Sequence, residues 1–179
     1  MMDFPLTLPH LLRRSETYFG EKEIVTRLPD KSFHRYTYAD MARRSMQLAV
    51  ALRGAGLEQG DRVATLCWNH YQHHEAYLGI PCGGFVLHTL NLRLHHNDIA
   101  YIAKHAGDRA LIVDRALLPL VELFKDKTDI EHVFVVEDSY EELLAGADAG
   151  DWREPELDEN AAAAMCYTSG TTGMPRYAS

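Results

Sequence analysis

The stretch that decides the fold class is Arg109-Ala-Leu-Ile-Val-Asp114, followed by a helical pattern over 116–125 and then by His132-Val-Phe-Val-Val136. Both short runs are apolar at consecutive positions, so neither strand can turn one face to water. Strands of this kind, separated by an amphipathic helix, are typical of βαβ units, in which helices cover both faces of a parallel sheet. The stretch therefore predicts an α/β fold with a doubly wound, largely parallel sheet and flanking helices.

The same alternation extends toward the N-terminus, where we expect strands over 62–67 and 85–90 and helices over 71–79 and 97–106. Before this region, apolar spacing predicts a helix that begins at Leu8 and ends near Gly20. Two β-rich runs, 23–27 and 32–36, are then separated by a Pro-containing turn, which predicts a hairpin.

Thr37-Tyr-Ala-Asp40 resembles a capping box in which Asp40 replaces the usual Glu. A helix is therefore expected to begin there and to end near Gly54.

A strongly acidic segment follows the last of these strands. From Asp138 to Glu159 there are nine acidic residues and one basic residue, so this segment alone supplies the net charge of −8. Ser139-Tyr-Glu-Glu142 predicts one more capped short helix, and the remainder is expected to be irregular. We interpret residues 138–160 as an acidic surface link.

Composition argues against several classes of protein. Clustered basic residues are absent from the sequence, so a nucleic-acid partner is not expected. Cys67, Cys82 and Cys166 are widely spaced and form no C-x-x-C motif, which favours neither a disulfide framework nor a zinc site and suits a reducing cytoplasm. We expect no secretory signal, and no apolar run approaches the roughly 20 residues needed to span a bilayer.

Histidines offer one alternative kind of site. His70 and His74 are spaced i and i+4 on one helical face, which can bind a metal, but no H-E-x-x-H pattern accompanies them. We therefore interpret them as polar residues on a helix surface. His95 and His96 are interpreted as part of a helix start.

The candidate functional stretch is Tyr167-Thr-Ser-Gly-Thr-Thr-Gly-Met-Pro-Arg176. Its glycines allow backbone amides to approach a ligand closely, and its hydroxyls can donate to phosphate oxygens or offer lone pairs to Mg²⁺. The apolar run 161–166 before it is expected to be a buried strand. The pattern thus predicts a phosphate-binding loop after a strand.

Better-known loops do not fit this stretch. A Walker-type loop requires Gly followed by Lys five positions after the first Gly, but Pro175 stands five positions after Gly170. No G-x-S-x-G is present either, so a hydrolase nucleophile elbow is excluded. A simple Thr/Gly-rich turn between two strands remains an alternative.

The stretch resembles the phosphate-binding signature of the adenylate-forming superfamily, which includes acyl-CoA synthetases, luciferases and peptide-synthetase adenylation domains. Three other segments agree in order and spacing, namely Tyr36–Asp40, Gly60–Val63 and Thr89–Leu94 with the following Asp98–Ile102. The last is similar to a segment of fatty acyl-CoA ligases. The resemblance covers essentially all of residues 1–179, but only the N-terminal part of that family's fold.

The resemblance implies a phosphate site with several members. Thr168 would associate with Mg²⁺, and the phosphates would be surrounded by Ser169, Gly170, Thr171, Thr172 and Gly173. Arg176 stands where the family usually has Lys, which keeps the positive charge but presents a planar guanidinium. Tyr177 replaces a usual Gly, and the strand that should return from the loop is expected to be missing. No catalytic residue is assigned within the chain.

The leading hypothesis from this resemblance is a fragment of a fatty acyl-CoA ligase for medium or long acyl chains. The complete enzyme would use ATP, Mg²⁺ and CoA to convert a fatty acid first to an acyl-adenylate and then to a thioester, whereas these 179 residues alone are expected to be inactive. One alternative is a non-catalytic binding or dimerisation module that forms a homodimer. Another is an unrelated nucleotide-binding α/β domain.

Overall fold

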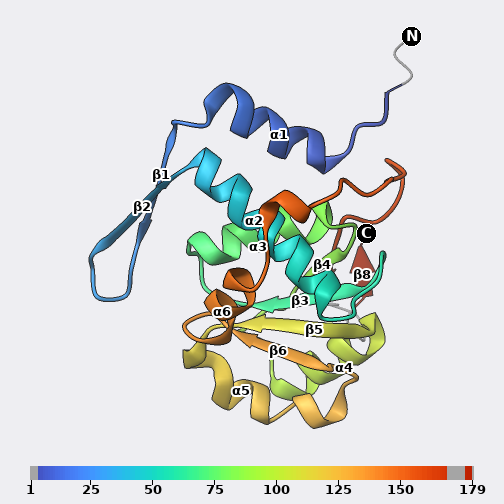
Figure 1. Cartoon of the computed structure of the whole chain (residues 1–179). Coiled ribbons are helices and arrows are strands. Elements are labelled where there is room, and N and C mark those ends of the chain that lie inside the picture. The colour runs from blue at the N-terminus through green and yellow to red at the C-terminus, as the bar shows by residue number, and fades with distance from the viewer. Residues whose placement is uncertain (1–3, 169–175, 179) are drawn as a thin grey trace.

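The computed structural model describes residues 4–168 and 176–178, and its centre is a six-stranded sheet (Figure 1). The strand order is β6-β5-β3-β4-β7-β8, and the bounds are β3 (Arg62–Leu66), β4 (Val86–Thr89), β5 (Asp108–Val113), β6 (His132–Val135), β7 (Ala164–Thr168) and β8 (Arg176–Ala178). The first five strands in this order are parallel, and β8 is antiparallel to β7. The predicted α/β fold with a largely parallel sheet is confirmed.

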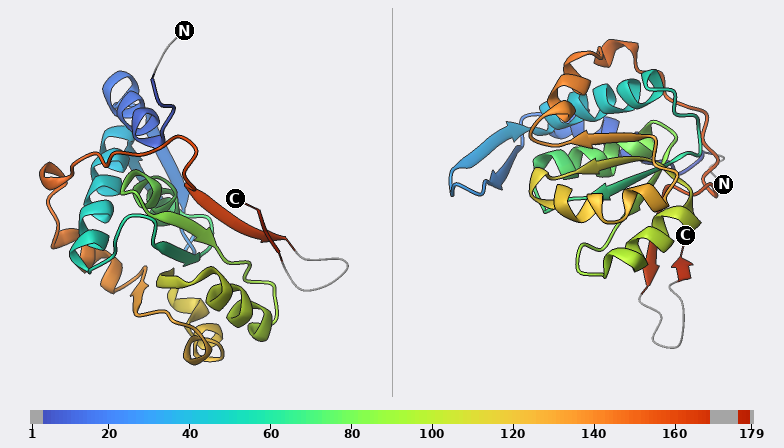
Figure 2. Two further views of the ribbon diagram at one scale, coloured as in Figure 1. Left: turned by 90° about the vertical axis from the view of Figure 1, so that its right-hand side faces the viewer. Right: turned by 90° about the horizontal axis from the view of Figure 1, so that it is seen from below.

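Helices lie on both faces of this sheet (Figures 1 and 2). Their bounds are α1 (Leu8–Phe19), α2 (Tyr38–Gly54), α3 (Tyr71–Cys82), α4 (His96–Ala106), α5 (Leu118–Glu122) and α6 (Ser139–Ala145). Three short 3-10 turns complete the described elements: η1 (Arg115–Leu117), η2 (Lys125–Lys127) and η3 (Ala149–Asp151).

Strand β5 shows why the central strands are apolar at consecutive positions. Ala110 and Ile112 belong to a core cluster that includes residues of α2, α3 and α6. The alternating residues Leu111 and Val113 belong to a second cluster, which includes residues of α4 and α5. Because successive side chains of a strand point to opposite faces, each helix layer covers one set, and the sheet is doubly wound as predicted.

A hairpin of β1 (Glu23–Arg27) and β2 (Phe33–Thr37) stands away from the large sheet (Figure 2). It leads directly into α2, whose capping box forms as predicted. Thr37 Oγ1 accepts the N–H of Asp40 at 3.2 Å, and Asp40 Oδ2 accepts the N–H of Thr37 at 3.1 Å. Two otherwise unpaired backbone donors are satisfied in this way.

Helices α2 and α3 pack unusually closely at Gly79. A Cβ atom at this position would lie 2.7 Å from the carbonyl oxygen of Ser45, which is on α2. Glycine is therefore required here by the approach of the α2 backbone.

The prediction of one continuous helix over 116–125 is wrong. The structure divides it into η1, α5 and η2, with α5 beginning at Leu118 and Pro119 in its first turn. Pro119 has no N–H to donate and restricts the residue before it, so it is best accommodated in the first turn of a helix. The helix expected over 71–79 instead continues through Pro81 to Cys82.

The acidic segment also differs in detail from expectation. Ser139 does not cap α6; its Oγ accepts the N–H of Val135 at 2.8 Å, and the N-cap position is held by Asp138 without a side-chain bond. Tyr140 and Leu144 of α6 are buried in the first cluster. From Gly146 to Ala163 the chain is irregular apart from η3.

Two expectations about the C-terminal region are wrong. The run 161–166 was expected to be a buried strand, but β7 begins at Ala164, and both Ala164 and Cys166 are exposed. The reason is that β7 pairs with β4 at only two positions, so most of it extends past its neighbour. The returning strand that was expected to be missing is present over Arg176–Ala178 as β8.

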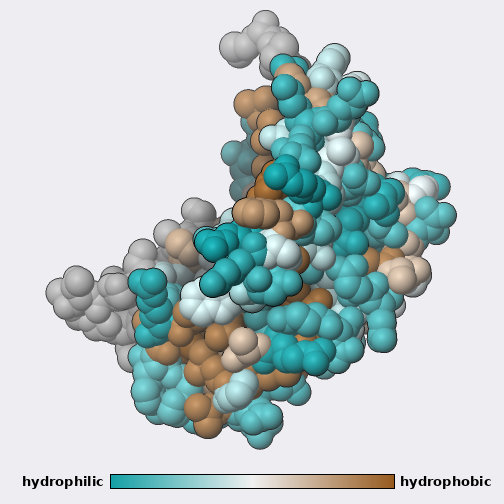
Figure 3. Space-filling model, turned by 90° about the vertical axis from the view of Figure 1, so that its left-hand side faces the viewer, coloured by the Kyte–Doolittle hydropathy of each residue, from teal (hydrophilic) through white to brown (hydrophobic). Residues whose placement is uncertain are grey.

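Apolar side chains gather at the lower end of the molecule in Figure 3, where α5 lies in Figure 1. Leu117, Leu118 and Leu120 are partly buried against the second cluster, and Leu123 is 54% exposed. None of the helices in the described ranges is long and apolar enough to cross a membrane.

Candidate functional site

The two described ends of the predicted phosphate loop lie opposite each other. Thr168 ends β7, Arg176 begins β8, and these two residues are partners in the antiparallel ladder. The remaining predicted site residues lie outside the described residues, namely Ser169, Gly170, Thr171, Thr172 and Gly173. The register therefore makes β7 and β8 an antiparallel pair, which we call the signature hairpin, with a hydroxyl-bearing residue and a cationic residue at facing positions.

Tyr167 connects this hairpin to the body of the protein. Its hydroxyl lies 2.6 Å from Nδ1 of His105 on α4, and its ring centre lies 5.3 Å from that of His88 on β4. The backbone ladder between β4 and β7 comprises only Leu87 with Ala164 and His88 with Met165. Side-chain contacts of Tyr167 thus extend the attachment of β7 beyond the last ladder pair.

His88 is itself held by a buried carboxylate. Its Nδ1 lies 2.8 and 2.9 Å from the two carboxylate oxygens of Asp108, and both side chains are fully buried. Burial raises the pKa of Asp108, although the hydrogen bond from His88 acts in the opposite direction. A buried polar pair of this kind needs its hydrogen bonds, because neither group has access to water.

Residues that end the neighbouring strands converge at the same edge of the sheet. His70, before α3, places Nε2 2.7 Å from Asp114 Oδ1, and Asp114 Oδ2 accepts the N–H of Trp68 at 2.7 Å. Burial alone would raise the pKa of Asp114, but these hydrogen bonds outweigh it and lower that pKa. Cys67 lies beside them, and burial raises the pKa of its thiol.

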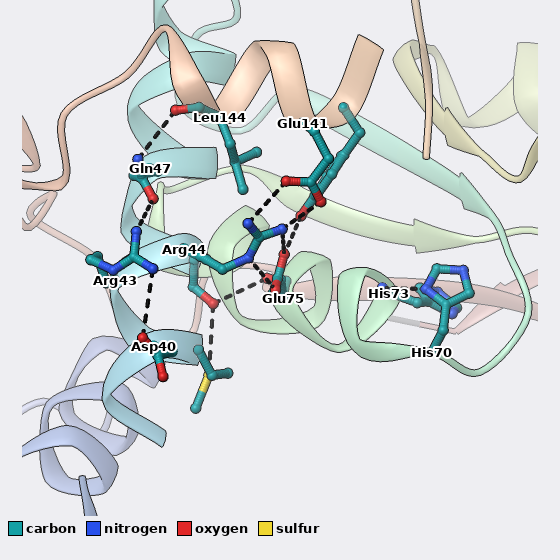
Figure 4. Close-up of polar contacts among 12 residues, drawn as sticks. Asp40, Arg43, Arg44, Gln47, His70, His73, Glu75, Glu141 and Leu144 are labelled. Carbon is teal, nitrogen blue, oxygen red and sulfur yellow. Dashed lines mark hydrogen bonds and ion pairs between the residues drawn. The ribbon is translucent and has the colours of Figure 1, made fainter. Parts of the chain in front are cut away.

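The interpretation of His70 as a residue on a helix surface is therefore wrong. His70 caps α3 by accepting the N–H of His73, and His73 is buried with ring nitrogens 3.1 Å from Trp68 O and from Thr65 Oγ1. Figure 4 shows both rings at the start of α3. His74, by contrast, is exposed. His95 does cap α4, as predicted.

An ionic network around the buried Glu75 joins α2, α3 and α6 (Figure 4). Arg44 contacts Glu75 through Nε at 2.6 Å and Nη2 at 3.1 Å, and it also contacts Glu141 at 2.7 Å. Tyr140 donates its hydroxyl to Glu75 at 3.0 Å. Glu75 is fully buried, and this burial raises its pKa against the opposing influence of Arg44. Sequence reasoning missed this network because its members are far apart in the chain.

A cavity of about 340 Å³ lies at the opposite edge of the sheet from the loop. It is lined by residues before β3, β4 and β7, including Gly60, Gly84 and Ala163, together with Leu6 near the N-terminus. In parallel sheets of this class, ligands bind beyond the carboxyl ends of the strands. The cavity is at the amino ends and is separate from the signature.

The parallel sheet with its flanking helices, together with the hairpin of β7 and β8, defines the class of protein. Residues 12–178 match the family model of AMP-binding enzymes, and the chain belongs to that family. The family resemblance drawn from Tyr167–Arg176 is thereby confirmed.

Individual relatives agree with the assignment. The chain is 46% identical over 184 residues to a long-chain-fatty-acid–CoA ligase of Thermus thermophilus, covering 98% of this chain and 33% of the relative. It is 37% identical over 190 residues to a 3-methylmercaptopropionyl-CoA ligase of Ruegeria lacuscaerulensis, covering 98% and 35%. The chain thus spans about a third of the length of these relatives.

A solved structure supports the fold. An anthranilate CoA ligase in complex with anthranoyl-AMP superimposes with a TM-score of 0.88 at 22% sequence identity, covering 98% of this chain and 35% of that one. At this identity the likeness establishes the fold: a parallel sheet flanked by helices, as in the N-terminal region of adenylate-forming enzymes.

Proposed function

We propose that this chain is the N-terminal, phosphate-binding part of an ATP-dependent fatty acyl-CoA ligase acting on medium or long acyl chains. The observation that carries the proposal is the pairing of Thr168 with Arg176 at the base of the signature hairpin. The similarity to a long-chain-fatty-acid–CoA ligase over 98% of the chain supports the substrate class.

In the proposed reaction, the fatty acid carboxylate attacks the α-phosphate of ATP, which forms an acyl-adenylate and releases pyrophosphate. The thiol of CoA then attacks the acyl carbonyl and displaces AMP to give the thioester. Negative charge grows on the phosphate oxygens in the first step, so positioned amides, hydroxyls and a cation lower its barrier.

Individual residues have separate proposed roles. Backbone amides and hydroxyls of Ser169 to Gly173 would surround the phosphates, and Arg176 would donate to a phosphate oxygen from the other strand. The hydroxyl of Thr168 suits the oxygen ligands that Mg²⁺ prefers. Bound Mg²⁺ would neutralise charge on the phosphates.

We further propose that residues 1–179 do not catalyse the reaction alone. Because the chain spans a third of its relatives, the groups that enclose the acyl chain, adenine and CoA are assigned to sequence outside it. We place the protein in the cytoplasm, where the free thiols of Cys67, Cys82 and Cys166 would remain reduced.

ATP–pyrophosphate exchange with fatty acids of different length tests the proposal. The complete ligase is expected to exchange with medium- or long-chain acids, and Arg176→Ala is expected to reduce that exchange while Arg153→Ala, a change on the irregular segment, does not. The purified 179-residue chain should show no exchange. Robust exchange by this chain, or exchange only with short acids, would contradict the proposal.

The hairpin favours a second function, assembly into a homodimer. Phe33 is 58% exposed and Val25 is 45% exposed on β2 and β1, which project from the body. Light scattering after gel filtration is expected to show a dimer that Phe33→Lys converts to a monomer. A wild-type chain that is monomeric at all concentrations would exclude this function.

A further inference from the structure

Three side chains with metal-binding atoms meet at one edge of the sheet. Cys67 directly follows β3, Asp114 directly follows β5, and His70 precedes α3. The Cys67 sulfur, a His70 ring nitrogen and an Asp114 carboxylate oxygen all lie within 4.8 Å of one another. Over residues 4–168 and 176–178, these are the only three such residues that come together in this way.

The topology explains why these residues converge. Strands β3 and β5 are parallel neighbours, so their carboxyl ends lie at the same edge. The chain leaves β3 toward α3, in one helix layer, and leaves β5 toward α5, in the other. Outgoing connections on opposite faces open a crevice between two strand ends, and such crevices are the usual ligand sites of open α/β sheets.

We propose that Cys67, His70 and Asp114 bind one divalent transition-metal ion, with Zn²⁺ the favoured species. A thiolate, an imidazole and a carboxylate are all ligands of tetrahedral Zn²⁺, and three protein ligands leave a fourth position for water. Mg²⁺ and Ca²⁺ prefer oxygen ligands only, so this site differs in chemistry from the proposed Mg²⁺ position at Thr168.

Two contacts orient Asp114 for this role. The Trp68 N–H occupies Oδ2 of Asp114, which leaves Oδ1 directed at His70. Cys67 and Asp114 are buried, whereas His70 also lines a groove between β1 and α3 that gives access from solvent. His73 is not a ligand, because its ring nitrogens already face Trp68 O and Thr65 Oγ1.

Cation binding requires a balanced movement of protons. Nδ1 of His70 accepts the N–H of His73 at 3.1 Å, so the neutral ring carries its proton on Nε2, facing Asp114. Coordination through Nε2 moves this proton to Nδ1, and the Cys67 thiol releases its proton to solvent. One proton is released per ion, and His70 can no longer accept from His73. Metal binding and the cap on α3 are therefore mutually exclusive.

The experiment uses the 179-residue chain, freed of metal with a chelator and titrated with Zn²⁺ against a chromophoric competitor. Co²⁺ is used in parallel, because its absorption reports thiolate coordination. We expect one ion per chain, a sulfur-to-cobalt charge-transfer band, and a shift of the His73 amide signal in ¹⁵N NMR when Zn²⁺ is added.

Matched variants assign the ligands. Cys67→Ser, His70→Gln and Asp114→Asn should each weaken Zn²⁺ binding by more than about 100-fold, since even residues that only support ligands contribute 10- to 100-fold. Cys166→Ser and His74→Gln alter an exposed thiol and the neighbouring exposed histidine, so they should leave binding unchanged. Circular dichroism of each metal-free variant checks that it is folded. If His70→Gln and Asp114→Asn do not fold, Zn²⁺ binding by Cys67→Ser alone tests the proposal.

Two outcomes would overturn the proposal. One is the absence of stoichiometric Zn²⁺ binding by the wild-type chain. The other is Zn²⁺ binding that Cys67→Ser leaves unchanged. Neither outcome depends on ligase activity, so the proposed function is tested separately.

Discussion

The hydroxyl of Tyr167 lies 2.6 Å from Nδ1 of His105, which ties the residue before Thr168 to helix α4. The β4–β7 ladder ends two residues earlier, at His88 and Met165. The direction in which the signature hairpin leaves the sheet is thus set partly by this side-chain contact, and we expect a change at His105 to act on the hairpin without altering any residue of the signature.

Tyr167→Phe removes this hydroxyl and keeps the ring against His88. In the complete ligase we expect the KM for ATP to rise about two- to tenfold, which is the effect of losing one neutral hydrogen bond. ATP–pyrophosphate exchange at varied ATP measures it. His105→Leu should have a similar effect, and the double variant should be little worse than either single one. Fully additive effects would show that the two residues act independently.

The two carboxylates that contact Arg44 should contribute very unequally to stability. Glu75 is fully buried, so Glu75→Ala leaves Arg44 and Tyr140 without their buried acceptor and should cost about 3–5 kcal/mol. The Glu141 side chain is 45% exposed, and Glu141→Ala should cost at most about 1 kcal/mol. Urea denaturation gives both free energies of unfolding. Equal losses of free energy of unfolding in the two variants would contradict the idea that the burial of Glu75 causes its larger contribution.

The capping box of α2 should give stability an acid-sensitive component. Hydrogen bonds from the Thr37 side chain and backbone lower the pKa of Asp40 below its ordinary value of 3.8. A lowered folded-state pKa contributes stability that is complete above the unfolded value and is lost as the pH falls through the folded value. Asp40→Ala should therefore cost about 0.5–1 kcal/mol near neutral pH, and this difference should shrink below pH 3.8. Unfolding curves of both proteins between pH 2 and pH 7 measure it.

Two glycines provide a matched test of helix packing. At Gly79 an added Cβ would lie 2.7 Å from Ser45 O, so Gly79→Ala should lower the free energy of unfolding by about 1–3 kcal/mol. At the end of α2, Gly54 has no atom within 4 Å of such a Cβ, so Gly54→Ala should be neutral or stabilising by up to about 1 kcal/mol. A tolerated Gly79→Ala would mean that α2 and α3 can separate at little cost.

Much of this fold could be predicted because the sequence features that determine its elements are local. Consecutive apolar residues at 111–113 required cover on both faces, and Thr37 with Asp40 fixed the start of α2. The order of the strands could not be predicted, because it depends on which distant strand pairs with which. The division of the predicted helix over 116–125 into shorter elements could have been predicted from the sequence, since Pro119 interrupts the helical pattern.

The candidate site was predictable only in part. The glycines and hydroxyls of Tyr167–Arg176 identified the signature, whereas the contacts of Tyr167 with His105 and His88 depend on α4 and β4. The convergence of Cys67, His70 and Asp114 required the parallel pairing of β3 with β5. Cysteine spacing alone favoured neither a disulfide framework nor a zinc site.

The pairing of β4 with β7 joins residues farther apart in sequence than any other strand pair in residues 4–168 and 176–178. Closing so long a loop costs entropy, and only two residue pairs offset that cost along the ladder. We therefore expect β7 to dock late during folding and to detach early when the native protein fluctuates. Nucleotide bound as proposed above would stabilise the docked state, so we expect ligand binding to favour completion of the sheet.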